Sequence, residues 1–325
     1  MKNINLVRFA VLAILAVSAT SAWAKHLKVL MVGNSFSICV LNEMPQCAAS
    51  AGETLDLASL YIGGCPLSRH WENIEKSANP QFKPYQFDYS YASAKDPNAA
   101  PVACLGKKTN IPQALVADRW DIVTIQQASA KSPFYDDYQP YADKLIAKIR
   151  ELAPQAEIVI QETWSYSPYA NRLPQMNMTP ETMHAALKEA YGKLAAKHRL
   201  RIIPTGDAVQ LYRKRLPVDY GRLLTQAERD AIRKPDLMDF HGDVAGASSW
   251  QKKKSDGTEH LHADTNHLNR EGYYLQACTW LAALFGTDVT TLSYAPSFLP
   301  PAKAKLMRAC AADAVAAEVA AFSKR

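Results

Sequence analysis

Short apolar runs alternate with longer amphipathic segments along most of the chain. The apolar runs are rich in branched residues and are predicted to be strands at 27–32, 55–62, 121–125, 157–161 and 201–204. Segments with helical periodicity lie near 37–51, 111–118, 137–152, 180–198, 269–285 and 302–322. This alternation predicts a parallel sheet with crossover helices, and strands that are apolar on both sides predict helices on both faces. We therefore expect an α/β fold, a three-layer α/β/α sandwich with a mostly parallel five-stranded sheet.

The loops at the predicted carboxyl edge of this sheet are long. They cover 63–110, 126–136, 162–179 and 205–266, where a handful of residues is usual. They also carry many aromatic residues, which are Trp71, Tyr85, Tyr89, Phe134, Tyr135, Trp164, Tyr166, Tyr169 and Trp250. Because ligands bind at this edge in open parallel sheets, we expect a site there. The aromatic rings suit the faces of sugars, but they can equally pack the loops onto the scaffold.

The first 24 residues have the features of an export signal. Lys2 and Arg8 precede the apolar run FAVLAILAV, and Ala22-Trp23-Ala24 places small residues at the two positions that a signal peptidase reads. This run is far shorter than the roughly 20 residues that a membrane-spanning helix needs. We expect cleavage before Lys25, instead of an uncleaved anchor, and no membrane span in the mature chain. The expected location is periplasmic or secreted.

Composition and charge narrow the picture further. The chain has 325 residues, 48% hydrophobic and 21% charged, which is typical of a globular protein. Since no Gly-, Ser- or Pro-rich linker divides it, we expect one domain over 25–325, with long loops and a C-terminal helix. Loss of Lys2 and Arg8 with the signal lowers the formal net charge from +6 to +4. The basic run 252–254 is typical of a solvated loop, so we expect no nucleic-acid partner.

Six cysteines lie in the mature part, where an oxidising compartment allows disulfides to persist. They are Cys39, Cys47, Cys65, Cys104, Cys278 and Cys310. Spacing does not determine their pairing. Bridges Cys65–Cys104 and Cys278–Cys310 are two hypotheses, and structural thiols are a third. No pair has the C-x-x-C spacing of a metal or redox motif.

The first predicted strand ends abruptly in the sequence MVGNSFS, residues 31–37. Gly33 permits a sharp turn, and Ser35 then opens a helix at the carboxyl edge of the sheet, where nearby backbone N–H groups stay free. Such groups favour the negative charge that develops when a serine attacks an ester. An Asn-Ser pair is also an ordinary helix cap, so Ser35 is a candidate nucleophile that still needs a base.

A candidate base and acid lie in HLHADTNHLNREGYY, residues 260–274. A serine nucleophile requires a base, and the base requires a third group that fixes its tautomer. His267 could take the proton from Ser35, and Asp264 could accept the other ring N–H. Two other interpretations stay open. The segment could be a helix-capping loop with solvent-facing histidines, or it could hold zinc or another divalent metal through the His/Asp cluster 260–267, with His262, Asp264 and His267 as ligands.

Four blocks of sequence together resemble the SGNH/GDSL-type serine hydrolase superfamily. They are VGNSFS after the first strand, YIGGCPLSRHW after the second, DIVTIQQAS at the third, and DTNHLNREGYYL before the last core helix. The chain is most similar to the DUF4886 branch, with some likeness to sialate O-acetylesterases. The resemblance implies a flavodoxin-like fold and ester hydrolysis without a metal or an organic cofactor. It also implies that Ser35 is the nucleophile and that Asp264 and His267 are its acid and base.

The resemblance implies an oxyanion hole as well. Its glycine block falls on Gly63 and Gly64, and Gly64 is the expected backbone donor beside the N–H of Ser35. The third block lacks the family asparagine and offers Gln126 and Gln127, and a glutamine amide can donate the same hydrogen bond. We expect Gln126 to do so, with Gln127 as the alternative because neighbours on a strand face opposite ways. The first block reads Gly-Asn-Ser instead of Gly-Asp-Ser, which leaves the nucleophile intact.

These observations predict an exported serine esterase that acts on O-acyl esters, acetyl esters above all, of a small molecule or a glycan. Arg69 and His70 follow the Gly-Gly turn and are candidates either for contact with a sugar or an acidic group or for solvated surface. Two alternatives from other classes remain: a non-catalytic carbohydrate-binding protein on the same fold, and the metal-dependent hydrolase.

Overall fold

The computed structural model describes residues 25–92, 107–216 and 223–325, and its centre is a seven-stranded sheet of order β4-β3-β2-β1-β5-β6-β7. The strands are β1 (His26–Gly33), β2 (Thr54–Tyr61), β3 (Tyr85–Ala92), β4 (Lys108–Thr109), β5 (Ile122–Ile125), β6 (Glu157–Gln161) and β7 (Arg201–Ile203). Neighbours from β2 to β7 pair in parallel, and β3 and β4 add an antiparallel edge. The five parallel strands are the five predicted strands. The antiparallel edge lies in a segment that was expected to be a loop.

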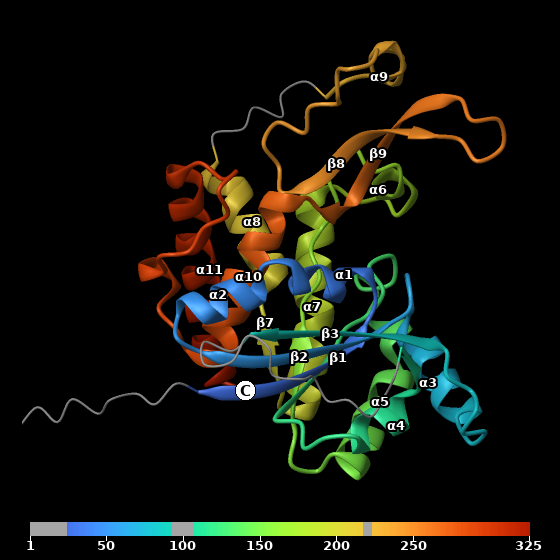
Figure 1. Ribbon diagram of the computed structural model, residues 1–325, viewed down its shortest axis with the longest axis vertical. Helices are drawn as coiled ribbons and strands as arrows, with labels where there is room; N and C mark the ends of the chain where they lie inside the picture. Colours follow the sequence, from blue (N-terminus) through green and yellow to red (C-terminus); the bar gives the residue numbers. More distant parts are fainter. Residues whose placement is uncertain (1–24, 93–106, 217–222) are drawn as a thin grey trace, which may run out of the picture.

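Helices cover both faces of the sheet (Figure 1). Four that contact one another lie on one face: α2 (Met44–Ser50), α8 (Thr205–Arg215), α10 (Arg270–Phe285) and α11 (Pro301–Phe322). A second contacting group on the other face is α3 (Leu67–Lys76), α4 (Ile111–Val116) and α5 (Tyr141–Leu152), and α7 (Pro180–His198) contacts β7 and α8 at the edge. The prediction of a three-layer α/β/α fold with a mostly parallel sheet is confirmed.

Local sequence explains where the elements begin. Thr179 caps α7 by accepting from the N–H of Thr182, and Pro180 occupies the first helical position, where a missing N–H costs nothing. Asn269 caps α10 by accepting from the N–H groups of Glu271 and Gly272. The strand residues 29–31 of β1 are fully buried, because helices cover both faces. The hydrophobic runs in the sequence therefore mark the centre of the core.

A second, two-stranded sheet stands apart from the first. It is the antiparallel hairpin β8 (Ala245–Lys252) and β9 (Glu259–Leu268). With the short helices α6 (Arg172–Gln175) and α9 (Gln226–Ala231) it forms a lobe that extends away from the main sheet in Figure 1. We call this part the hairpin lobe. The expectation of a loop over 205–266 is wrong, because this segment holds α8, α9, β8 and most of β9.

Some expectations fall on residues that the structure does not describe, which include the export signal at 1–24 and Cys104. Cys65, Cys278 and Cys310 are free thiols in the structure, so the Cys278–Cys310 bridge is not formed. Within the described ranges, no helix combines the length and the apolar character that crossing a membrane requires.

A buried ion pair attaches the hairpin lobe to α8. The guanidinium of Arg213 donates to both carboxylate oxygens of Asp243, each at 3.0 Å, and also to the Ser165 hydroxyl at 2.6 Å. Asp243 precedes β8, and its backbone carbonyl accepts from the Asn269 side chain at 2.8 Å. The ion pair therefore fixes the start of β8 against α8, and the Asn269 side chain ties the end of β9 to the same residue.

Asp243→Ala is expected to lower the free energy of unfolding by about 3–5 kcal/mol, because it leaves the Arg213 charge buried without its partner. Urea denaturation followed by circular dichroism measures this change. Glu259→Ala is the control, since it breaks the exposed pair with Lys234 and should cost less than about 1 kcal/mol. Equal losses in the two variants would contradict the assigned role of Asp243.

Candidate active site

Three side chains from opposite ends of the chain form one hydrogen-bonded series. Ser35 begins α1 (Ser35–Ile38) directly after β1, and its Oγ lies 2.8 Å from Nε2 of His267. Nδ1 of His267 lies 2.8 Å from Oδ2 of Asp264. Both His267 and Asp264 come from the last residues of β9, not from a tight turn before α10. This is the arrangement in which an imidazole can take a proton from a serine hydroxyl.

The Asp264 carboxylate can hold the His267 imidazole in place, whether the ring is charged or neutral. Its Oδ1 accepts from the backbone N–H groups of Asn266 and His267 at 3.0 and 3.1 Å. Burial acts to raise the pKa of the Asp264 carboxyl, but the hydrogen bonds from the His267 ring and from these two N–H groups outweigh it and bring the pKa below its usual range. Asp264 is therefore ionised at neutral and mildly acidic pH.

Aromatic packing sets the position of the imidazole. The Phe36 ring stacks on Trp164 with centroids 4.3 Å apart, and the His267 ring lies 5.2 Å from Phe36. The Trp164 indole donates to the carbonyl of Asn266 at 2.9 Å, next to His267 in the chain. Trp164 is fully buried, so it packs the site instead of meeting a sugar. Packing of the loop aromatics onto the scaffold is one of the two alternatives that the sequence leaves open, and the burial of Trp164 agrees with it. The support that Trp164 gives to His267 has no sequence signal, because a ring in a long loop gives no sign of which surface it faces.

The nucleophile-bearing helix α1 is held by three amide side chains. Asn34 caps it by accepting from the N–H of Phe36 at 3.0 Å, and it donates to the carbonyl of Cys65 at 3.1 Å. The carbonyl of Phe36 accepts from Gln161 at 2.7 Å and from Gln276 at 3.1 Å. A carboxylate at position 34 could accept from Phe36 but could not donate to Cys65. The asparagine in the Gly-Asn-Ser block therefore ties the nucleophile turn to the glycine turn.

The glycine turn lies beside the nucleophile. β1 and β2 are parallel neighbours with Gly33 opposite Tyr61, so the residues after Tyr61 follow the same edge as Ser35. Gly64 adopts φ +59°, which favours glycine. Within the described residues, the N–H groups of Ser35 and Gly64 donate to no protein acceptor. Both are thus available to an oxyanion. Gly63 and Gly64 are both exposed residues of this turn, so exposure does not decide between them.

The two candidate glutamines lie in different surroundings. The Gln126 amide donates to Oδ1 of Asn34 at 2.7 Å, immediately beside the nucleophile. The Gln127 side chain accepts from the N–H of Leu67 at 3.0 Å and donates to the carbonyl of Asp137 at 3.0 Å, which holds the start of α3. Gln126 is therefore the glutamine that lies beside the nucleophile turn, and Gln127 supports the fold.

If this site hydrolyses esters with Gln126 as an oxyanion donor, replacing Gln126 by leucine should lower kcat by about a hundredfold, the usual cost of losing one such donor. Steady-state kinetics with an activated acetyl ester measures this effect. Gln155→Leu, which removes an amide that donates to the Trp120 carbonyl far from the site, serves as the control. A kcat for Gln126→Leu equal to that of the control would show that Gln126 is not a donor in the oxyanion hole.

Two other candidate residues do not reach this site. His70 is fully buried, stacks on Tyr85 and has its Nδ1 2.8 Å from the Tyr85 hydroxyl. Burial, with a smaller effect from the nearby Arg69 charge, lowers the pKa of His70 to about 3. The expectation that His70 lies at the surface, in contact with a sugar or with solvent, is wrong. Arg69 is exposed on α3.

The histidine cluster does not form a metal centre in the structure. In the described part of the chain, three possible ligand atoms lie within 4.8 Å of one another on Glu162, His184 and Asp207. The side chains of the 260–267 cluster do not bring three such atoms together. Oδ1 of Asp207 lies 2.8 Å from His184, and Oδ2 lies 2.7 Å from Lys188. These ion pairs account for the conformation of Asp207. The geometry thus favours the proton-transfer interpretation of His267.

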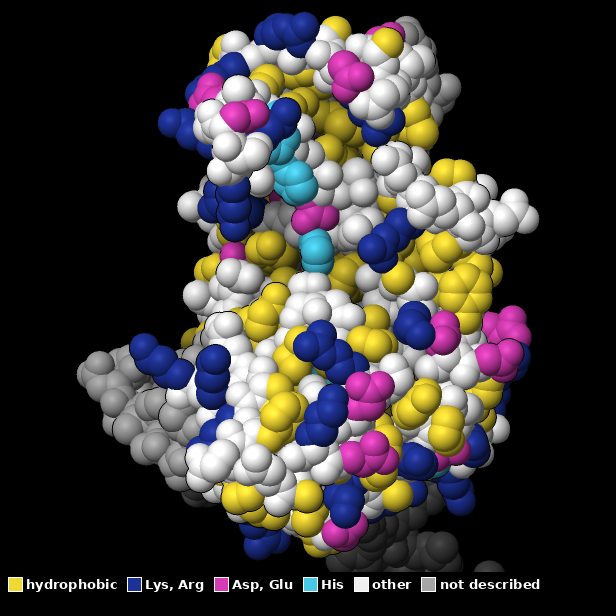
Figure 2. Space-filling model, turned by 90° about the vertical axis from the view of Figure 1, so that its right-hand side faces the viewer, with side chains coloured by type: hydrophobic (Ala, Val, Ile, Leu, Met, Phe, Trp, Pro, Cys, Tyr) yellow, Lys and Arg dark blue, Asp and Glu magenta, His cyan; other side chains and the backbone are white. Residues whose placement is uncertain are grey.

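A cavity of about 1150 Å³ opens at the nucleophile, lined by Ser35, Asp264 and His267. Ile38, Leu41 and Tyr273 give it apolar surface. Figure 2 shows that the molecule is hollowed between the main domain and the hairpin lobe, and histidine and acidic side chains are visible in that hollow. The site can thus admit a substrate from solvent.

Comparison with known proteins gives one family and several solved structures. The family model described as DUF4886, domain of unknown function, matches residues 28–216. A DUF4886 family protein from Bacteroides uniformis is 26% identical, with a TM-score of 0.66, and the match covers 90% of this chain and 95% of that chain. The prediction of the DUF4886 branch is confirmed.

Two further structures are more distant. A candidate SGNH hydrolase from Slackia heliotrinireducens is 16% identical with a TM-score of 0.44, covering 78% of this chain and 96% of that one. A candidate GDSL-like lipase from Parabacteroides merdae is 11% identical with a TM-score of 0.41, covering 79% of this chain and 95% of that one. No curated protein matches the chain.

Proposed function

The chain belongs to the DUF4886 family, and on that premise we propose that it is an exported serine esterase that hydrolyses acetyl or other short O-acyl esters on carbohydrate. The single observation that carries the proposal is the series from Ser35 Oγ through His267 to Asp264, with both contacts at 2.8 Å. A helix cap alone would not require a histidine and a carboxylate in this order.

The proposed reaction has two stages. In the first, Ser35 Oγ attacks the ester carbonyl while His267 takes the hydroxyl proton, and the imidazolium then gives that proton to the departing alcohol. In the second, His267 takes a proton from water as the water oxygen attacks the acyl-enzyme carbonyl, and the imidazolium returns that proton to Ser35 Oγ as the bond to the acyl group breaks and the acid is released. The negative charge of each tetrahedral intermediate is stabilised by hydrogen bonds from the backbone N–H groups of Ser35 and Gly64 and from the side-chain amide of Gln126. Every step uses side chains and backbone groups of this chain.

The cavity supports a carbohydrate ester as the substrate. Its wall combines the apolar side chains with Asn42, Asn269 and Arg270. The Arg270 guanidinium lies over the Phe298 ring, 4.2 Å from its centroid, and both line the cavity. Sugars present apolar faces and hydroxyl groups together, so a wall of this mixed kind suits them. Export is part of the proposal and is supported by the signal-like sequence before Lys25.

Hydrolysis of p-nitrophenyl acetate by the chain from Lys25 onward tests this proposal. We expect turnover that decreases from acetyl to longer acyl chains and that is unchanged after dialysis against a chelator, because no step needs a metal ion. Loss of turnover on chelation, with recovery on adding zinc, would instead favour the metal-dependent hydrolase. Binding of glycans without turnover of any activated ester would favour the non-catalytic alternative.

A further inference from the structure

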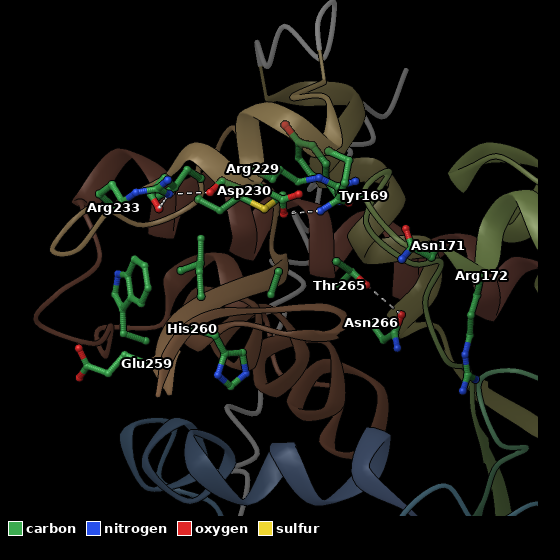
Figure 3. Close-up of a pocket in the computed structure, with 16 residues that line it drawn as sticks. Tyr169, Asn171, Arg172, Arg229, Asp230, Arg233, Glu259, His260, Thr265 and Asn266 are labelled. Carbon is green, nitrogen blue, oxygen red and sulfur yellow. Dashed lines mark hydrogen bonds between the residues drawn. The ribbon is translucent and has the colours of Figure 1, made fainter. Parts of the chain in front are cut away.

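A second cavity, of about 730 Å³, lies between the hairpin and α9 (Figure 3). Leu261, Ala263 and Thr265 line it from β9, whereas the intervening residue Asp264 lines the cavity of Ser35. Because neighbours on a strand point to opposite faces, the hairpin separates the two cavities. The second cavity therefore shares a strand with the proposed catalytic residues and is distinct from their site.

The second cavity contains an arginine with unmet hydrogen-bonding capacity. The Arg229 guanidinium lies over the Tyr169 ring, 5.8 Å from its centroid, and Figure 3 shows the two side chains together. Its Nε is buried and has no acceptor among the described residues. The Tyr169 hydroxyl is fixed by His241 at 3.0 Å and by the N–H of Leu224 at 3.2 Å, so the ring that supports Arg229 cannot move freely. A guanidinium held in this way lacks an anionic acceptor.

The other charges of the cavity leave room for such an acceptor. Arg233 also lines it, and one of its terminal nitrogens donates to the carbonyls of Asp230 and Ile232, which leaves further donors on the guanidinium. Glu259 is already paired with Lys234 at 2.8 Å. The Asp230 carboxylate accepts from Gln226 at 2.7 Å, and its remaining lone pairs can accept a hydroxyl. The cavity thus offers donors for an anion and an acceptor for a neutral hydroxyl group.

The remaining walls favour a sugar over a peptide. Trp250 lines the cavity, and its ring is fixed because the indole N–H donates to the Asp236 carbonyl at 2.9 Å. The amide and hydroxyl side chains of Asn171, Thr265 and Asn266 line the same space. A fixed aromatic ring beside several short polar groups matches the apolar face and the hydroxyls of a pyranose.

We propose that this second cavity binds an acidic carbohydrate, a sugar chain that carries carboxylates, with Arg229 and Arg233 on the carboxylates and Trp250 against a ring face. This inference deepens the proposed function and in that respect rests on it. The ester that reacts at Ser35 would then belong to an acidic glycan, another part of which is bound in the second cavity on the other side of the hairpin. The binding itself does not depend on catalysis.

Isothermal titration of the Ser35→Ala variant with a short galacturonate oligomer tests the binding directly. We expect saturable binding at one site, no binding of a neutral gluco-oligomer of equal length, and at least about tenfold weaker binding when Arg229→Gln is added. Trp250→Leu is a second variant, outside the contact of Arg229 with Tyr169, and should also weaken binding. Arg119→Gln, an exposed arginine outside the cavity, is the matched control and should bind as the parent does.

Three results would overturn the proposal. These are no binding of galacturonate, equal weakening by Arg119→Gln and Arg229→Gln, and equally tight binding of a poly-glutamate peptide of the same charge.

A kinetic measurement separates this failure from failure of the proposed function. With active Ser35, Arg229→Gln should raise KM for an acetylated galacturonate oligomer while leaving turnover of p-nitrophenyl acetate unchanged. Turnover of p-nitrophenyl acetate with no effect of Arg229→Gln on either substrate would contradict only the acidic-glycan site.

Discussion

Replacing Ser35 by alanine is expected to lower kcat for ester hydrolysis by about 10⁴-fold or more, leaving only the weak catalysis that an oxyanion hole supplies without a nucleophile. Ser35 Oγ is the atom that lies within hydrogen-bond distance of His267, and α1 is held by Asn34, Gln161 and Gln276. Loss of a hydroxyl should therefore leave the fold intact. Initial rates with p-nitrophenyl acetate, together with a thermal melt, measure both effects.

Ser68→Ala is the matched control for this variant. Ser68 lies on α3, close in the chain to the glycine turn. Removing its hydroxyl should change kcat by less than about twofold. Residual activity of Ser35→Ala close to that of Ser68→Ala would show that another group attacks the ester. Cys39 also lines the cavity, but burial raises the pKa of its thiol to about 12, which leaves it protonated and a poor nucleophile.

Asp264→Asn is expected to lower kcat by about 10³–10⁴-fold, because the amide cannot hold His267 in the required tautomer or stabilise the imidazolium. The pKa of Asp264 lies below the ordinary aspartate value, so the wild-type carboxylate stays ionised as the pH falls to about 4. The wild-type rate should therefore show no titration of Asp264 between about pH 5 and pH 8, and the loss in the variant should be present throughout this range. Rates of both proteins across this range, with an ester whose spontaneous hydrolysis is subtracted, measure it.

Asp256→Asn is a suitable control for Asp264→Asn, because Asp256 lies in the turn of the same hairpin and accepts from the N–H and hydroxyl of Thr258. It should retain near wild-type activity at every pH. Activity of Asp264→Asn equal to that of Asp256→Asn at every pH would contradict the assigned role of Asp264.

The parallel core of this fold could be predicted from sequence. Buried parallel strands are apolar on both faces, so each of the five is marked by a short, mainly apolar run. The placement of Ser35 and of Asp264 and His267 followed from the rule that loops at the carboxyl edge meet, and from the resemblance of four ordered blocks. The structure then brings these residues together across more than two hundred positions of chain.

The remaining elements lacked such a signal. β8 and β9 are exposed or half-buried over most of their length, so no hydrophobic alternation marked them. α8 starts one residue after β7, with Pro204 as its cap, and no loop separated the two in the sequence. His70 illustrates the limit for single residues, because a histidine next to an exposed turn has the same local sequence whether it faces solvent or Tyr85. Long-range packing, not local pattern, decides these cases.

Covalent labelling tests the central claim most directly, because an alkyl fluorophosphonate reacts with a serine only where a base activates it and an oxyanion hole receives the charge. Mass spectrometry of the intact labelled protein, followed by peptide mapping, identifies the site. We predict one adduct per chain, on Ser35, that is absent in Ser35→Ala and strongly slowed in His267→Ala. An adduct on another residue, or ester turnover that continues undiminished when Ser35 is fully labelled, would contradict the account.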